Sequence, residues 1–165
     1  MPNIILIGSR GSGKTQTGKI ISQMLKLNLI STDKEIINKV GPIKDFVEQN
    51  NWEKFREIEE EVISKIDVDN TVVDCGGGVV EREKNIEHLK KLGKVIWLKA
   101  GVQKIIERIK DKKDLPALTG KSFTGEVEEI LAKREPLYRK TADFEVDTDN
   151  KTIQEIADEI VGLVK

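Results

Sequence analysis

The sequence predicts one α/β domain in which helices pack on a mainly parallel β-sheet. Short apolar runs alternate with longer stretches that carry apolar residues at helical spacing, as in successive β-α-β units. The first apolar run leads directly into a glycine-rich loop and then an amphipathic stretch. The length of 165 residues suits one compact core and is too short for two comfortable domains, so residues 1–165 are expected to form a single domain.

Five short apolar runs are the predicted strands. Each is four or five residues long. The third run follows Asp69-Asn70 and precedes three glycines, and such turn-forming residues bound a strand on both sides. The predicted strands are residues 3–7, 28–31, 71–75, 94–98 and 143–146.

Amphipathic stretches between and after these runs predict helices. In residues 52–66, the side chains of Phe55, Ile58, Val62 and Ile66 recur at helical spacing, so this face is predicted to lie in the core. Two further predicted helices are residues 17–27, after the glycine-rich loop, and residues 152–164, at the end of the chain.

Residues 111–125 break the alternation of strands and helices. They read DKKDLPALTGKSFTG, with few core-type residues and three helix breakers. A long irregular segment in a compact domain is usually functional, and often it is a lid that closes over an active site. We therefore predict a mobile lid in this segment.

Composition and charge exclude several classes of function. The chain has 28 basic and 29 acidic residues, interspersed, without the basic stripe of a nucleic-acid-binding protein. The single cysteine, Cys75, excludes an intramolecular disulfide and a cysteine-based zinc cluster, and is expected to be a buried packing residue. The sequence lacks a signal-peptide pattern and any apolar stretch near the ~20 residues of a membrane span. We expect a cytoplasmic monomer that binds neither nucleic acid nor membrane, with His88 solvated at its surface.

Residues 8–15 carry the motif with the strongest chemical meaning. They read GSRGSGKT and fit the phosphate-binding pattern G-x-x-x-x-G-K-[ST] in the strand–loop–helix context that this pattern requires. Backbone N–H groups of the loop and the start of the next helix would surround the phosphates of ATP. Lys14 is the expected catalytic contact to the β- and γ-phosphates, and the Thr15 hydroxyl is an expected Mg²⁺ ligand. The predicted ATP-binding residues here are Gly8, Gly11, Ser12, Gly13, Lys14, Thr15 and Gln16.

A dinucleotide-binding fingerprint is the competing interpretation of the same glycines. Gly11 and Gly13 form a G-x-G, and Asp33 follows twenty residues later. The third glycine of that fingerprint would fall on Gln16, and Lys14 would be unexplained. The phosphate-binding loop is therefore the better interpretation.

Further motifs, in order along the chain, resemble those of the shikimate kinase family over residues 4–148. After the phosphate-binding loop come TD at 32–33, FREIEE at 55–60, GGGVV at 76–80, KREPLY at 133–138 and VDT at 146–148. The spacing agrees with the family apart from one residue fewer between Gly41 and Phe55. The resemblance implies a three-layer P-loop kinase fold with five parallel strands in the order 2-3-1-4-5. It also implies transfer of the γ-phosphoryl group of ATP to the 3-hydroxyl of shikimate, with Mg²⁺ as cofactor.

The resemblance also assigns roles to residues around the acceptor. Arg56 and Arg134 match the arginines that bind the carboxylate of shikimate, and guanidinium groups hold carboxylates bidentately. Asp33 matches the residue that accepts hydrogen bonds from the reacting hydroxyls and acts as base. Gly77 and Gly78 match a glycine turn whose backbone approaches the acceptor.

Three further assignments rest on the same resemblance. Residues 33–60 are the expected acceptor-binding segment, in which Glu59 would orient Arg56. Arg108 matches an arginine that packs over the nucleotide base.

Each of these residues taken alone also has an ordinary structural interpretation. Arg56 and Glu60 are four residues apart and could form a surface ion pair on a helix. Asp33 could cap the helix that follows it, and Arg134 is one of many basic residues on a helix. Their joint occurrence in family order behind a phosphate-binding loop favours the functional interpretation.

Two positions depart from the family pattern. Ser31 stands where the family carries the first aspartate of Asp-x-Asp, which helps to hold the Mg²⁺ water shell. Asp74 ends an apolar strand, and we hypothesise that it takes over this role. Leu115 stands where the family has an arginine in the lid, for which Lys112 or Lys113 could substitute.

Two other functions fit parts of the sequence. A related P-loop kinase for gluconate or a nucleoside monophosphate would explain the loop and lid, but not the joint match at Asp33, Arg56 and Arg134. A family member that binds ligand without catalysis would explain only the changes at Ser31 and Leu115.

Overall fold

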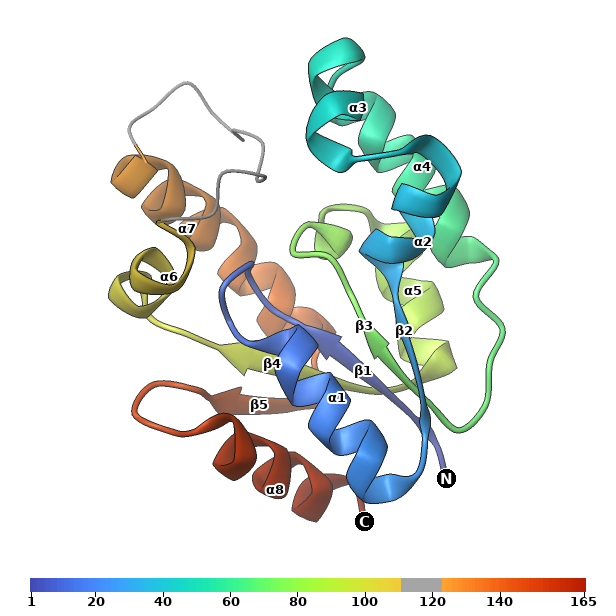
Figure 1. Cartoon of the computed structure of the whole chain (residues 1–165), viewed down its shortest axis with the longest axis vertical. Helices are drawn as coiled ribbons and strands as arrows, with labels where there is room; N and C mark the ends of the chain where they lie inside the picture. Colours follow the sequence, from blue (N-terminus) through green and yellow to red (C-terminus); the bar gives the residue numbers. More distant parts are fainter. Residues whose placement is uncertain (111–122) are drawn as a thin grey trace.

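The computed structural model describes residues 1–110 and 123–165, which include a sheet of five parallel strands (Figure 1). The strand order is β2-β3-β1-β4-β5, and every pairing between neighbours is parallel. The predicted sheet and its strand order are therefore confirmed. The strands are β1 (Asn3–Ile7), β2 (Asn28–Ser31), β3 (Thr71–Asp74), β4 (Gly93–Lys99) and β5 (Phe144–Asp147).

Helices cover both faces of the sheet, which gives three layers. Alternate residues of β1 point to opposite faces, so that Ile4 packs with one apolar cluster and Ile5 with the other. On the Ile4 face lie α1 (Lys14–Leu25) and α8 (Ile153–Val164). The opposite face is covered by α4 (Trp52–Ser64), α5 (Glu83–Leu92) and α7 (Phe123–Thr141).

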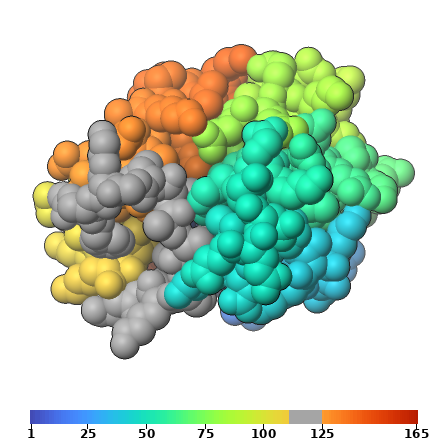
Figure 2. Space-filling view, turned by 90° about the horizontal axis from the view of Figure 1, so that it is seen from above, coloured from blue at the N-terminus to red at the C-terminus, as the bar shows by residue number. Residues whose placement is uncertain are grey.

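The remaining elements gather at the carboxyl ends of the strands. There β2 leads directly into α2 (Thr32–Val40), which is followed by α3 (Ile43–Gln49), and β3 leads into the short helix η1 (Val79–Glu81). The helix α6 (Val102–Ile109) follows β4. Figure 2 looks onto this end and shows α3 and α4 in teal and green and α7 in orange. The yellow-green segment of η1 and α5 lies next to both: α5 contacts α4, and η1 contacts α7.

Several element boundaries differ from the predictions. Helix α1 begins at Lys14 instead of residue 17, because the left-handed backbone of Gly13 ends the loop there. Phe55 and Ile66 are buried as predicted, but Ile58 and Val62 are only half-buried. On α4 the residues Glu59 and Ile63 are buried in their place, so the middle of the core face is rotated from the predicted one. The rotation places a carboxylate in the interior, where it pairs with Arg56.

The predicted lid falls largely on residues outside the described ones. Helix α7 already begins at Phe123, within the predicted segment 111–125. Residues 111–122, which include Lys112, Lys113 and Leu115, lie outside the described residues.

Three smaller expectations can be compared with the structure. Cys75 is buried, as expected. His88 is half-buried with its Nε2 2.8 Å from the carbonyl oxygen of Ile66, so the expectation of a fully solvated histidine was wrong. Within residues 1–110 and 123–165, none of the helices has the length and apolar character needed to cross a membrane.

Candidate active site

The glycine-rich loop between β1 and α1 has the backbone of an anion-binding turn. Gly11 has a φ of 81°, and a Cβ at this position would lie 2.7 Å from the Cγ2 of Ile109. A side chain here would be strained and would also displace α6, so glycine is required. The loop therefore leaves its backbone open to a phosphate group.

Lys14 lies within the curve of this loop and is 8% exposed. Its Nζ donates hydrogen bonds to the carbonyl oxygens of Gly8 at 2.8 Å and Ser9 at 2.9 Å, and it lies 3.5 Å from the Oγ of Ser12. Burial lowers the pKa of Lys14 below its ordinary value, while the carboxylates of Asp74 and Asp33 oppose the shift. The ammonium group is thus held where phosphate oxygens can replace loop carbonyls as its partners.

Thr15 and Asp74 connect the loop to the neighbouring strand. The Thr15 hydroxyl donates a hydrogen bond of 2.7 Å to Oδ2 of Asp74. In the register of β2 and β3, Asp74 pairs with Ser31, the position where the family carries its first aspartate. A hydroxyl and a carboxylate side by side are the oxygen donors that Mg²⁺ prefers, and Mg²⁺ takes its other ligands from phosphates and water. These residues fit a nucleotide-bound Mg²⁺ ion.

Asp33 lies in the first turn of α2, half-buried. The cap of α2 is Ser31, whose Oγ accepts a hydrogen bond from the backbone N–H of Lys34, so the interpretation of Asp33 as the helix cap is wrong. Burial raises the pKa of Asp33 above its ordinary value; Asp74 adds to the rise, while Lys14 and Arg56 oppose it. Such a carboxylate binds a proton more readily than an exposed one.

Arg56 projects from α4 and is fixed by contacts on several sides. Its NH1 donates to Oε1 of the buried Glu59 at 2.8 Å, and its guanidinium lies 5.2 Å from the ring centroids of Trp52 and Phe55. Glu60 pairs instead with another arginine, so the interpretation of Arg56 and Glu60 as a surface pair is wrong. A Cβ at Gly78 would overlap the guanidinium of Arg56, so the glycine turn makes room for this side chain.

Arg134 approaches from α7 on the opposite side and is 3% exposed. Its Nε has no hydrogen-bond partner within the part of the chain that the structure describes, and its NH1 would lie 3.3 Å from a Cβ placed at Gly77. Tyr138, one turn further along α7, donates a hydrogen bond of 2.6 Å to the carbonyl oxygen of Gly77. Burial raises the pKa of Tyr138 to about 12, so its hydroxyl stays protonated and ties α7 to the glycine turn.

A cavity of about 410 Å³ lies where these elements meet. It brings together the five residues assigned to the acceptor by resemblance: Asp33, Arg56, Gly77, Gly78 and Arg134. Residues 33–60 contribute much of its wall through α2, α3 and α4. The carboxylate of Asp33 and the guanidinium groups of Arg56 and Arg134 thus face a single space beside the phosphate-binding loop.

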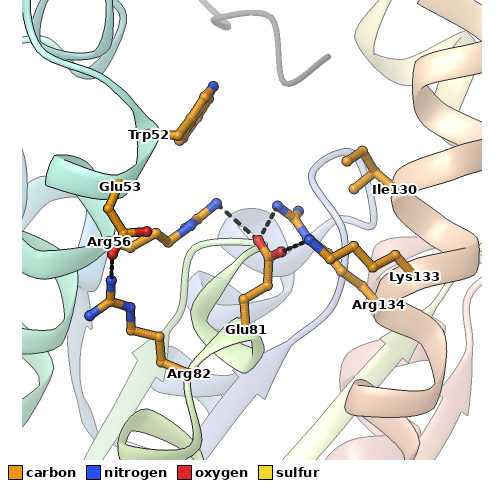
Figure 3. Close-up of a pocket in the computed structure, with 8 residues that line it drawn as sticks. All are labelled: Trp52, Glu53, Arg56, Glu81, Arg82, Ile130, Lys133 and Arg134. Carbon is orange, nitrogen blue, oxygen red and sulfur yellow. Dashed lines mark hydrogen bonds and ion pairs between the residues drawn. The ribbon is translucent and has the colours of Figure 1, made fainter.

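A second cavity of about 310 Å³ adjoins this one and is shown in Figure 3. Arg56 and Arg134 line both cavities. Between the two guanidinium groups lies the carboxylate of Glu81, which comes from the end of η1. The other residues of this wall are Trp52, Glu53, Arg82, Ile130 and Lys133.

The remaining predicted nucleotide residues lie around the loop. Arg108, in the last turn of α6, donates from NH1 to the carbonyl oxygen of Gly11 at 2.9 Å. Gln16 is exposed in the first turn of α1, and Ser12 is buried within the loop. Arg108 therefore lies beside the loop at the edge that a bound nucleotide would approach.

Three residues of the site received no role from the sequence. Tyr138 is the single tyrosine and follows Arg134 by four residues, a spacing that places both on one helix face, so this signal was available. Arg10 lines the larger cavity and pairs with Glu126 at 3.0 Å, and Glu81 lies between the arginines. Arg10 occupies a variable position of the phosphate-binding pattern, Glu81 lies outside the recognised motifs, and the partners of both residues are far away in the sequence.

Comparisons with known proteins agree with this geometry. A family model described as shikimate kinase matches residues 10–165. A shikimate kinase from Caldanaerobacter subterraneus subsp. tengcongensis is 38% identical over 98% of this chain and 95% of its own length. One from Leptospira biflexa serovar Patoc is 33% identical over 99% of this chain and 96% of its own length.

Solved structures show the same relationship. A shikimate kinase from Acinetobacter baumannii, solved in complex with shikimate, has a TM-score of 0.95 at 30% identity and covers 99% of this chain and 93% of its own. A deoxyadenosine kinase from M. mycoides reaches a TM-score of 0.70 at 17% identity over 98% of this chain and 97% of its own, and so shares the fold alone. On the family model, these relatives and the shared fold, the chain belongs to the shikimate kinase family.

Proposed function

We propose that this chain transfers the γ-phosphoryl group of ATP to the 3-hydroxyl of shikimate, giving shikimate 3-phosphate and ADP. The observation that carries the proposal is the cavity beside the phosphate-binding loop, where Asp33, Arg56 and Arg134 face one space. Shikimate is a small acid with one carboxylate and three hydroxyls, which matches two guanidinium groups and one carboxylate.

Acceptor binding would begin with the carboxylate. Arg56 and Arg134 approach it from α4 and α7, and each can donate two N–H groups to a carboxylate. The N–H of Arg134 Nε, which has no partner among the described residues, is a donor that an acceptor or a water could satisfy. Holding the acid end in this way would turn the ring hydroxyls towards Asp33.

The transfer itself breaks one P–O bond and forms another. The bond between the γ-phosphorus and the bridging oxygen of the β-phosphate breaks as the acceptor hydroxyl oxygen bonds to that phosphorus. The hydroxyl proton passes to the carboxylate of Asp33, whose raised pKa favours its capture. Lys14 would neutralise charge on the β- and γ-phosphates, so the protein acts mainly through positioning and electrostatics.

The cofactor in this proposal is Mg²⁺ bound together with ATP. Thr15 would ligate the ion directly, and Asp74, hydrogen-bonded to Thr15, would hold a water of its coordination shell. Bound there, the ion would neutralise charge on the phosphates of ATP.

An ADP-release assay with Mg-ATP tests the proposed reaction. Shikimate, gluconate and AMP are each added separately to the protein and Mg-ATP. Release of ADP is expected with shikimate and not with gluconate or AMP. Lys14→Ala should lose the activity by about 100-fold or more, because the contact to the reacting phosphates is removed. Lys19→Ala, an exposed change on the same helix, serves as the control and should keep the wild-type rate. Turnover with gluconate or AMP in place of shikimate would contradict the proposal.

We also propose that the chain works as a monomer in the cytoplasm. The single cysteine is buried and free, as suits a reducing compartment. Light scattering should give a mass near 18.6 kDa, and twice that value would contradict the monomer.

A further inference from the structure

Glu81 occupies the space between the two arginines of the proposed acceptor site. Its Oε2 accepts a hydrogen bond of 2.9 Å from NH2 of Arg134 and lies 3.3 Å from NH2 of Arg56. Its Oε1 lies 2.7 Å from Nζ of Lys133. Figure 3 shows the carboxylate pointing between the two guanidinium groups, one from α4 and one from α7.

Both arginines have contacts besides those with Glu81. Arg56 is held by Glu59 and by the rings of Trp52 and Phe55. Arg134 is almost fully buried in α7, beside the glycine turn that Tyr138 anchors. Removal of Glu81 should therefore leave both guanidinium groups in place.

The Glu81 carboxylate makes the kind of contact that an acceptor carboxylate would need. Burial alone would raise the pKa of Glu81, but the hydrogen bond from Lys133 and the charges of Arg134 and Arg56 outweigh it and lower the pKa below its ordinary value. The group therefore remains an anion at neutral pH. A second carboxylate bound to the same two guanidinium groups would be repelled by it and would share its hydrogen-bond donors.

We propose that Glu81 is a specificity-determining residue, a built-in carboxylate that competes with the carboxylate of the acceptor for Arg56 and Arg134. This inference rests on the proposed function, because it assumes an acidic acceptor in the adjoining cavity. Glu81 is 18% exposed and Lys133 is 63% exposed, so the carboxylate can follow the lysine towards solvent when an acceptor enters. The competition lowers affinity for acids and leaves affinity for uncharged acceptors unchanged.

Steady-state kinetics of Glu81→Gln test the proposal through the direction in which the KM for shikimate changes. The amide keeps the shape and removes the charge, so the KM for shikimate should fall by about 5- to 20-fold from the loss of like-charge repulsion. The kcat and the KM for ATP should stay within about twofold, since Glu81 contacts neither Lys14 nor the loop. An unchanged or raised KM for shikimate would overturn the proposal, because a residue that only supports the arginines raises KM when it is lost.

Glu53→Gln is the matched control. Glu53 lines the same cavity and carries the same charge, but it pairs with Arg82. Its KM for shikimate should stay within about twofold of wild type, since an exposed rim charge is screened. A fall equal to that of Glu81→Gln would mean that charge anywhere in the cavity matters, which would also overturn the specific role of Glu81.

Calorimetry with two ligands separates repulsion between carboxylates from other effects of the substitution on binding. Shikimate should bind Glu81→Gln more tightly than wild type, whereas an analogue with a hydroxymethyl group in place of the carboxylate should bind both proteins equally. If Glu81→Gln fails to fold, Glu81→Asp, whose shorter side chain should not reach both arginines, should lower the KM in the same direction, and an unchanged or raised KM there would overturn the proposal. Absence of turnover in wild type would contradict the proposed function, whereas wild-type turnover without the KM shift would contradict only the role of Glu81.

Discussion

The hydrogen bond from Thr15 to Asp74 places a carboxylate beside the phosphate-binding loop, at the residue for which the sequence suggested a role in holding Mg²⁺. Asp74 ends β3 and pairs in register with Ser31, which ends β2 and caps α2. A serine at this position caps the helix well but cannot supply a negative charge. Because Ser31 and Asp74 are partners in the register of neighbouring strands, Asp74 lies where it could supply the charge that Ser31 lacks.

Asp74→Asn should raise the Mg²⁺ concentration needed for half-maximal rate by about 10-fold or more, in the range typical of groups that orient metal ligands. Initial rates measured against free Mg²⁺ at saturating ATP would detect this change. Asp67→Asn, an exposed change before β3, should leave the Mg²⁺ dependence unaltered. An unchanged Mg²⁺ requirement in Asp74→Asn would show that Asp74 has no role at the ion.

Gly78→Ala tests whether the glycine turn positions Arg56. The new methyl group would overlap the guanidinium, so the KM for shikimate should rise about 10-fold or more while the KM for ATP changes little. Gly162→Ala is the control: it lies inside α8 with nothing within 4 Å, and it should raise the free energy of unfolding by about 0.5–1 kcal/mol without altering kinetics. Wild-type KM values in Gly78→Ala would mean that Arg56 does not bind the acceptor from its present position.

Asp33 should make the protein less stable at neutral pH than an uncharged residue would. Its folded-state pKa is raised above the ordinary value of 3.8, mainly by burial, so the folded chain binds this proton more tightly than the unfolded chain. The resulting loss in free energy of unfolding is fully present above the folded-state pKa of Asp33. It disappears as the pH falls from this pKa towards 3.8.

Asp33→Asn should therefore melt at a higher temperature than wild type at pH 8, and the difference should shrink as the pH falls through that window. The same variant should lose about 100-fold or more in kcat, because the proposed proton acceptor is gone. Melting curves of both proteins from pH 8 to pH 4 give the comparison. An equal difference at every pH would contradict a raised pKa at this residue.

At the scale of elements, the helix that closes the domain has the best-defined start. The Oγ of Thr152 accepts from the backbone N–H of Glu155, whose side chain in turn accepts from the backbone N–H of Thr152. This reciprocal capping box begins α8, which packs on α1 next to the phosphate-binding loop. Its loss should weaken the domain without touching the proposed chemistry.

Thr152→Ala should lower the free energy of unfolding by about 1 kcal/mol, whereas Thr152→Ser should keep most of it. Urea unfolding gives both values, and the two KM values should equal those of wild type. A variant that loses activity together with stability would show that the start of α8 also shapes the loop.

The central strands β1 and β3 could be predicted well because their sequence and their burial agree. All residues of β1 and β3 are buried, and their apolar centres, Ile4–Ile7 and Val72-Val73, stand out beside turn-forming residues. The predicted start of helix α1 was less accurate, because the first residue of this helix is set by the left-handed backbone of Gly13 and not by the apolar repeat. The core face of α4 was misjudged because Glu59 is buried by its pairing with Arg56, which periodicity does not reveal.

The residues of the site likewise differ in how far the local sequence reveals them. Gly11 and Lys14 are recognisable because one continuous segment makes the loop, and local sequence carries its geometry. Arg56 and Arg134 could be assigned only through resemblance to a family. The position of Glu81 in the site could not be predicted from the sequence, because it depends on two arginines that tertiary packing brings to it from α4 and α7.

At the scale of the whole molecule, both ligands would bind where the parallel strands end. The loop after β1, the turn after β3 and the helices α2 and α4 converge there with α7 from the opposite side (Figure 1). In open parallel sheets this edge is the usual ligand position, because loops from neighbouring strands meet there. A ligand at this edge contacts several elements at once and should stabilise the folded chain as a whole.

Thermal shift should therefore respond separately to each proposed ligand. At about 100 times its dissociation constant, a ligand adds about 2.7 kcal/mol to the free energy of unfolding, which for a chain of this size raises the melting temperature by about 5–10 °C. Mg-ATP and shikimate should each produce such a shift. Lys14→Ala should lose mainly the response to Mg-ATP, and Arg56→Ala mainly the response to shikimate, since the first contacts the loop and the second lines the acceptor cavity. A response to only one of the two ligands would favour a protein that binds without catalysing transfer, and a response to neither would contradict the assignment of both sites.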